Sequence, residues 1–210
     1  SPNQARILLA EIGRENSFNY NTIYGFHSDP KRGYNIGMIS WQGPRFQPLV
    51  DRLNAKGLLN SGVMSRTDAT LEVQIDYILY EINNLSIYSP TKKLFLGDKN
   101  VSYSVGTRVL GTNYIAWAYG ESAFSSGHQN RDAFYKRVLD VTKGNTEGPV
   151  TALIRDTATS LLEQVKNNPK VGMGVLKNQK QTVDNASKAY AGIVKSAADK
   201  TTQMTTGVTA

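Results

Sequence analysis

The chain has 210 residues and no cysteine, and 24 Lys and Arg against 17 Asp and Glu give it a formal net charge of +7 at pH 7. This length allows one substantial core with an appendage. The absence of cysteine excludes disulfide scaffolds, thiolate metal sites and cysteine catalysis. No apolar run approaches the roughly 20 residues of a membrane-spanning helix, so no membrane span is expected.

Taken in chain order, the first 145 residues are dominated by helical patterns. Apolar residues at spacings of three and four predict a helix over 3–16, and the Asn, Gly and Ser-Asp-Pro turns of 18–42 predict a short β-hairpin. Further helices are expected near 44–56, 68–86, 113–121 and 130–143, with a loop-rich stretch over 87–111. The predicted class is α+β, mostly helical.

The distribution of aromatic residues predicts where the core lies. All but one of the 19 Phe, Trp and Tyr residues precede residue 150, and such side chains supply much of a core's buried area. We therefore expect a globular domain over 1–145 and a helical, partly flexible arm or linker over 146–210, with helices near 149–167 and 179–200. Packing of these helices on the main domain is the alternative. The start Ser1-Pro2-Asn3, with neither Met nor a signal segment, suggests a processed or excised chain.

Glu15 is the first candidate catalytic residue. It lies at the end of the first predicted helix, just before the break at 16–19. A carboxyl group there faces the negative end of the helix dipole, and neighbouring apolar side chains would partly desolvate it. Both effects favour the protonated form that a general acid needs. Glu11, one turn earlier, is the rival.

The predicted hairpin supplies a second carboxylate and polar and aromatic side chains. Asp29 lies in the turn before the strand at 33–36, across an expected cleft from Glu15. Two carboxylates flanking a cleft are what glycoside hydrolysis requires. Flat rings such as those of Tyr34 and Trp41 are suited to stacking on sugars. The candidate substrate-binding residues are Tyr34, Asn35, Ser40, Trp41 and Gln42.

These residues resemble a known family. Residues 14–19, Arg-Glu-Asn-Ser-Phe-Asn, are similar to the helix end of lysozyme-superfamily muramidases and lytic transglycosylases, where Glu is followed by Ser, an aromatic residue and Asn. Residues 37–45 are similar to the Gly-hydrophobic-Gln-Trp-x-Gly-x-Arg element of phage tail lysozymes, with Ser40 in place of the Gln. Residues 71–82 resemble the family helix that pairs Gln with a later Glu-Leu or Glu-Ile. The resemblance covers residues 3–142.

The resemblance implies a lysozyme-like fold with a small β-hairpin subdomain and Glu15 as general acid. In small phage muramidases, an Asp and a Thr precede the matching Ile-Gly pair, and here Asp29 and Asn35 occupy those places. The implied function is a virion-associated peptidoglycan hydrolase that cleaves the β-1,4 bond between N-acetylmuramic acid and N-acetylglucosamine and helps the phage genome into the host. Its partners would be glycan strands and, through 146–210, other virion or tail proteins.

Three alternatives remain open from the sequence. A lytic transglycosylase on the same scaffold would use Glu15 alone and give 1,6-anhydro products. A structural or wall-binding protein with an inactive lysozyme fold would bind glycan without cleaving it. A chitinase or chitosanase of related fold would act on oligomers without the lactyl group.

The remaining polar residues predict no further chemistry. His27 and His128 are far apart, so no metal site or other cofactor is expected. His128 is interpreted as a solvated turn residue, and His27 as a surface loop residue, with a position lining the cleft as the alternative. Arg131 is likewise interpreted as a surface or structural charge. The basic residues are scattered rather than gathered in the stripe typical of DNA-binding proteins, so nucleic acid is not an expected partner. An anionic cell-wall polymer fits the net charge as well.

Overall fold

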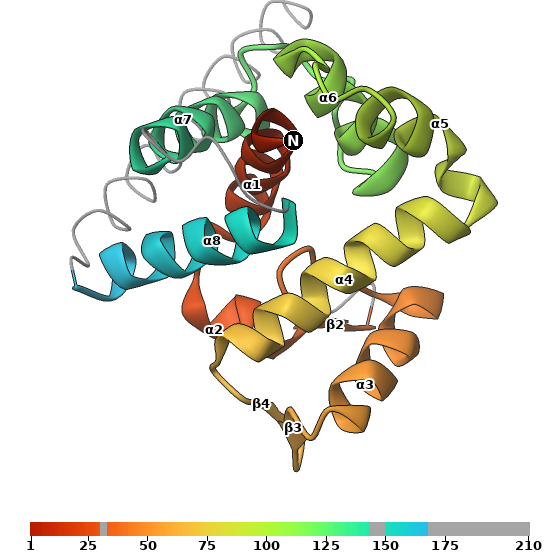
Figure 1. The fold of residues 1–210 in the computed structure, drawn as a ribbon, viewed down its shortest axis with the longest axis vertical. Coiled ribbons are helices and arrows are strands. Elements are labelled where there is room, and N and C mark those ends of the chain that lie inside the picture. The colour runs from red at the N-terminus through yellow and green to blue at the C-terminus, as the bar shows by residue number, and fades with distance from the viewer. Residues whose placement is uncertain (30–32, 143–149, 168–210) are drawn as a thin grey trace, which may run out of the picture.

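The computed structural model describes residues 1–29, 33–142 and 150–167 (Figure 1). Its helices are α1 (Pro2–Asn16), α2 (Tyr20–Ile23), α3 (Phe46–Ala55), α4 (Asp68–Asn84), α5 (Ser89–Thr91), α6 (Tyr103–Val109), α7 (Ser126–Val141) and α8 (Val150–Asn167). Short 3-10 turns are η1 (Gly43–Arg45) and η2 (Ser86–Tyr88), and π-helical turns are η3 (Lys92–Leu96) and η4 (Leu110–Tyr114). Two antiparallel hairpins pair β1 (Phe26–Asp29) with β2 (Gly33–Ile36) and β3 (Leu59–Asn60) with β4 (Val63–Met64). The α+β, mostly helical class is confirmed.

Helix α1 has clear start and stop signals and forms the centre of the fold. Ser1 caps it in a capping box with Gln4, which fixes the first turn. The helix ends at Ser17, whose left-handed φ of 54° lets its N–H donate to the carbonyl of Gly13 at 2.7 Å. Most side chains of α1 are buried, because α6, α7 and α8 all pack against it.

Helix α8 packs into the same core as the first 142 residues. It crosses α1 and lies between α7 and α4 (Figure 1). Its Ile154 and Leu161 are fully buried within the main hydrophobic cluster. Packing on the main domain, the alternative that the sequence left open, therefore describes residues 150–167. The helix predicted near 179–200 lies outside the described residues.

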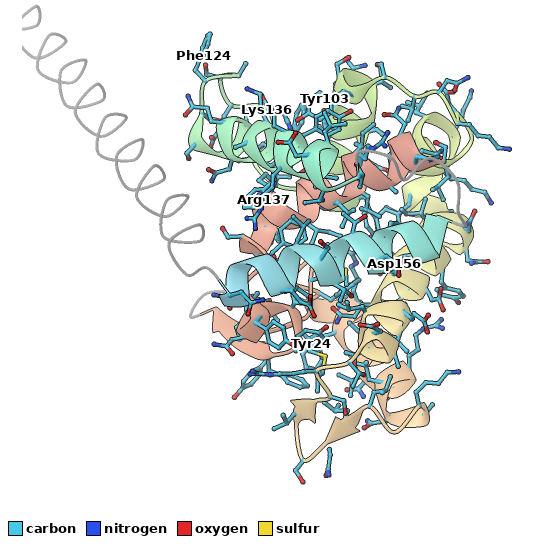
Figure 2. All side chains as sticks on the ribbon, turned by 60° about the vertical axis from the view of Figure 1, so that its left-hand side comes forward. Tyr24, Tyr103, Phe124, Lys136, Arg137 and Asp156 are labelled. Atoms are coloured by element: carbon cyan, nitrogen blue, oxygen red, sulfur yellow. The ribbon has the colours of Figure 1, made fainter. Side chains whose placement is uncertain are left out.

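Aromatic contacts mark the edge of the core near α7. Figure 2 shows Tyr103 of α6 beside α7, where its ring centroid lies 4.1 Å from that of Tyr135. The same view shows Phe124 projecting from the loop that precedes α7, and this side chain is 82% exposed. Aromatic side chains in this region thus differ sharply in burial, although the sequence alone does not distinguish which of them join the core.

The prediction of a loop over 87–111 is wrong. These residues form a succession of short helical turns, from η2 to the start of η4. Their local pattern is irregular, but Tyr88 packs edge-on against Tyr114, and Asn113 accepts a hydrogen bond from the Thr91 hydroxyl at 2.7 Å. Contacts between the turns therefore stabilise helical backbone that local periodicity did not indicate. The helix predicted over 113–121 is also wrong, because Ala116, at a φ of 57°, has a non-helical backbone.

Candidate functional site

The end of α1 is fixed to the turn that follows the first hairpin. Asn16 donates from Nδ2 to the carbonyl of Met38 at 2.5 Å, and its Oδ1 accepts from the N–H of Phe18 at 2.7 Å. Ser17 and Phe18 both have left-handed backbones, with φ of 54° and 52°. The Phe18 side chain is fully buried and packs edge-on against Phe134 of α7. The residues just after Glu15 are therefore held from both sides.

The turn itself is supported from α4. Ile36 and Trp41 form a β-bridge around residues 37–40, and Gly37 adopts a φ of 74° that favours glycine. Gln74 accepts from the Met38 N–H at 2.8 Å and donates to the Ile23 carbonyl at 3.0 Å. One buried amide on α4 thus holds both the turn and the end of α2.

Glu15 is at the end of α1, where the sequence placed it. Its side chain is 22% exposed, so it is accessible to a ligand although most of its surface is covered by the protein. Arg14 donates from a terminal nitrogen to Glu15 Oε2 at 2.6 Å. The sequence analysis did not identify Arg14 as part of the site.

His27 of β1 belongs to the same neighbourhood. Its Nε2 lies 3.2 Å from the hydroxyl of Ser40, a residue with a left-handed φ of 57°. Burial lowers the pKa of His27 from its ordinary value, while the Glu15 carboxylate acts in the opposite direction. The Glu15 charge therefore reaches His27, and His27 contacts Ser40. His27 is therefore not in an exposed surface loop, because it lies on strand β1 and is half-buried against the turn.

Glu11 is fully buried one turn below Glu15. Its Oε2 accepts from Arg14 Nε at 3.0 Å and from Trp117 Nε1 at 3.1 Å, and Arg131 of α7 lies 4.0 Å from its Oε1. Burial raises the pKa of Glu11, and the Arg14 and Arg131 charges only partly offset this effect. Because the side chain is 0% exposed, Glu11 cannot contact a substrate directly in this structure.

The interpretation of His128 as a solvated surface residue is wrong, whereas Arg131, expected to be a surface or structural charge, is a structural one. Both are buried, at 6% and 5% exposure. Arg131 donates to His128 Nδ1 at 3.0 Å, which leaves the proton on Nε2 for the Tyr119 carbonyl at 2.9 Å. These residues support Glu11 from α7 rather than facing solvent.

The prediction that Trp41 stacks on a sugar is wrong for this structure. The Trp41 side chain is fully buried, and its indole N–H donates to Glu81 Oε2 at 2.9 Å. Glu81, also fully buried, accepts from Arg45 Nε at 2.8 Å, Arg45 Nη2 at 2.7 Å and the Tyr114 hydroxyl at 2.8 Å. Burial raises the pKa of the Tyr114 phenol, which keeps it a donor. Trp41 therefore stabilises the wall behind the turn.

The other predicted site residues have different environments. Tyr34 is 72% exposed on β2 and is open to contact a ligand. Asn35 pairs with His27 across the hairpin but is buried, and among the described residues its Oδ1 has no hydrogen-bond partner. Gln42 is half-buried, and its Oε1 is likewise unpaired within the described part. Asp29 pairs with Gly33 through the backbone register, and its side chain lies outside the described part of the structure.

Two signals in the sequence could have revealed more of the site. Gln74 and Glu81 are seven residues apart on one helix, which places them on the same face, and both contact the segment 36–45. Arg14 lies directly before Glu15 and three residues after Glu11, a helical spacing for an ion pair. The burial of Glu11 by Trp117 had no such signal.

Comparisons with known proteins identify no relative. No family model matches the chain, and neither a curated protein nor a solved structure shows significant similarity to it. Within residues 1–29, 33–142 and 150–167, no three His, Asp or Glu side chains form a cluster that could hold a metal ion. Over the same ranges, no helix combines the length and apolar character needed to span a bilayer.

Proposed function

We propose that the protein is a peptidoglycan hydrolase of lysozyme-like fold that cleaves the β-1,4 bond between N-acetylmuramic acid and N-acetylglucosamine. The observation that carries this proposal is the position of Glu15. It is a partly exposed carboxyl group at the end of a buried helix, and its charge acts on His27 of the adjoining hairpin. A general acid needs such a partly desolvated and fixed position next to the bond it protonates.

In this mechanism Glu15 protonates the glycosidic oxygen as the bond to the sugar breaks. Asp29, on the β1 strand, stabilises the cationic sugar or positions the attacking water. Tyr34 is exposed and offers a flat ring for a sugar, and Ser40 offers a hydroxyl that contacts His27. The net charge of +7 attracts the chain to the anionic wall polymer.

The reaction is tested by mass spectrometry of the products released from purified sacculi. Wild type, Glu15→Gln and Asp29→Asn are compared, with Glu163→Gln on the exposed face of α8 as the matched control. We expect reducing muramic acid ends from wild type and the control, and their loss in both active-site variants. Because Glu15→Gln preserves shape and removes the acid, its residual rate should fall at least about 100-fold.

The same experiment separates the alternatives. Anhydromuramic ends that disappear only with Glu15→Gln indicate a lytic transglycosylase, in which the muramic 6-hydroxyl attacks in place of water. Glycan binding that survives Glu15→Gln, without cleavage by wild type, indicates a structural or wall-binding protein. Cleavage of chitin oligomers but not of sacculi, assayed with the same variants, indicates a chitinase or chitosanase.

The proposed location is the phage virion, in the tail or among internal ejected proteins, with action in the host periplasm and cell wall. The support is the resemblance of residues 14–19 and 37–45 to phage tail lysozymes. Immunoblotting of purified particles tests this point, and a signal found only in lysates contradicts it.

A further inference from the structure

Arg14 is shared between two carboxylates that have different surroundings. Its Nε donates to Glu11 Oε2 at 3.0 Å, and its Nη2 donates to Glu15 Oε2 at 2.6 Å. Glu11 is 0% exposed and Glu15 is 22% exposed. One guanidinium therefore connects a buried acid to the accessible acid of the candidate site.

The guanidinium is also held from the side. Its central carbon lies 4.3 Å from the ring centroid of Trp117, and the Trp117 indole N–H donates to the same Glu11 oxygen that Arg14 contacts. Trp117 in turn packs closely against Gly127, where a Cβ would come within 2.7 Å of the indole ring. Arg14 is only 10% exposed, so few other orientations are open to it.

We propose that Arg14 is a positioning residue for Glu15, and that buried Glu11 anchors Arg14 in the orientation this requires. The inference rests on the proposed function and adds to it a residue that does not touch the substrate. Arg14 fixes the direction of the Glu15 carboxyl group through a short charge-assisted hydrogen bond. Glu11 and Trp117 fix Arg14.

The same contacts place one positive charge between the two acids. Among the described residues, the charged or titratable groups facing Glu15 are Arg14 and His27, and those facing Glu11 are Arg14 and Arg131. A positive neighbour stabilises the ionised carboxylate, and Glu11 shares that positive charge. Removing Arg14 and removing the Glu11 charge should therefore act on Glu15 in opposite directions.

The test compares Arg14→Gln, Arg14→Lys and Glu11→Gln with wild type in two measurements. The first is the pH dependence of kcat and KM on purified sacculi. The second is the titration of the Glu15 carboxyl group by carbon-13 NMR, assigned with Glu15→Gln, which requires no activity. Arg108→Gln, an exposed Arg on α6, is the matched control for lost charge.

We expect Arg14→Gln to lower kcat about tenfold or more with less than about a twofold change in KM, because misorientation affects the reacting group rather than binding. The alkaline limb of its pH profile, the range in which kcat falls as Glu15 loses its proton, should move to higher pH by about one unit. In Glu11→Gln the limb should move down. Arg14→Lys should keep the limb near wild type and still lose rate, because an ammonium lacks the planar fork that contacts both acids. Arg108→Gln should change neither.

A purely structural role for Arg14 would lower stability without moving the limb. If Arg14→Gln does not fold, Arg14→Lys and Glu11→Gln decide the question. A Glu15 titration that stays within about 0.3 pH units of wild type in every folded variant overturns the inference. The absence of cleavage by wild type overturns the proposed function instead, so the two failures are distinguishable.

Discussion

Replacing Glu81 by Gln should destabilise the fold by about 3 kcal/mol. Glu81 is fully buried and accepts hydrogen bonds from Trp41, from the Tyr114 hydroxyl and from two nitrogens of Arg45. Removing one partner of a buried ion pair costs about 3–5 kcal/mol, because the other charge remains buried and unpaired. The new amide keeps one acceptor oxygen, which places the expected loss near the lower end.

The loss can be measured by urea unfolding followed by tryptophan fluorescence. Arg45 is 22% exposed, so water can partly solvate the charge that the substitution leaves behind, and this limits the loss. At about 2–4 °C per kcal/mol for a domain of this size, the melting temperature should fall by about 6–12 °C. Glu163→Gln, exposed on α8, should change stability by less than about 0.5 kcal/mol.

A loss below about 1 kcal/mol in Glu81→Gln would refute this reasoning. It would mean that the buried charges contribute little beyond the hydrogen bonds that an amide can also make. Combining Glu81→Gln with Arg45→Met completes a double-mutant cycle, in which we expect strong coupling between the two positions. Independent, additive losses would contradict an ion pair that acts as one unit.

Three further predictions follow from the packing and the charges. Gly13→Ala should cost about 1–3 kcal/mol in thermal melts, because its Cβ would lie 2.6 Å from the Phe134 ring; an unchanged melting temperature would contradict this close packing. Gly37→Ala should cost about 3 kcal/mol, because the φ of 74° is unfavourable for alanine and the new Cβ would displace Gln74 Oε1. Gly62→Ala is the control, because φ there is 78° but the space around the new Cβ is open. A loss in Gly37→Ala no greater than that in Gly62→Ala would argue against the contact with Gln74. Since burial lowers the pKa of His27, the unfolded chain binds a proton below about pH 6.5 that the folded protein resists. Stability should therefore fall as the pH drops below that value, and unfolding curves of His27→Gln should show a weaker fall; an equal fall would assign the effect to other groups.

Several parts of the fold could be predicted from local sequence because one physical pattern determined each of them. Apolar residues every three or four positions indicate α1, α4 and α7, since burial of one helix face needs only that spacing. The Asn, Gly and Pro turns indicate the β1–β2 hairpin for similarly local reasons. The helix also ends near the break that the sequence indicates, which leaves Glu15 in the last turn of α1.

The environment of each site residue was decided only by tertiary packing. The sequence suggests Trp41 as a ring for stacking on sugars, yet its side chain is fully buried and its indole N–H donates to Glu81, 40 residues later. Glu11 and Glu15 lie on the same helix, yet Glu11 is fully buried and accepts from Trp117, 106 residues later, while Glu15 is 22% exposed. Charge, burial and hydrogen bonding depend on which distant side chains meet. Local periodicity determines the elements, and the contacts among them determine which carboxyl group remains accessible.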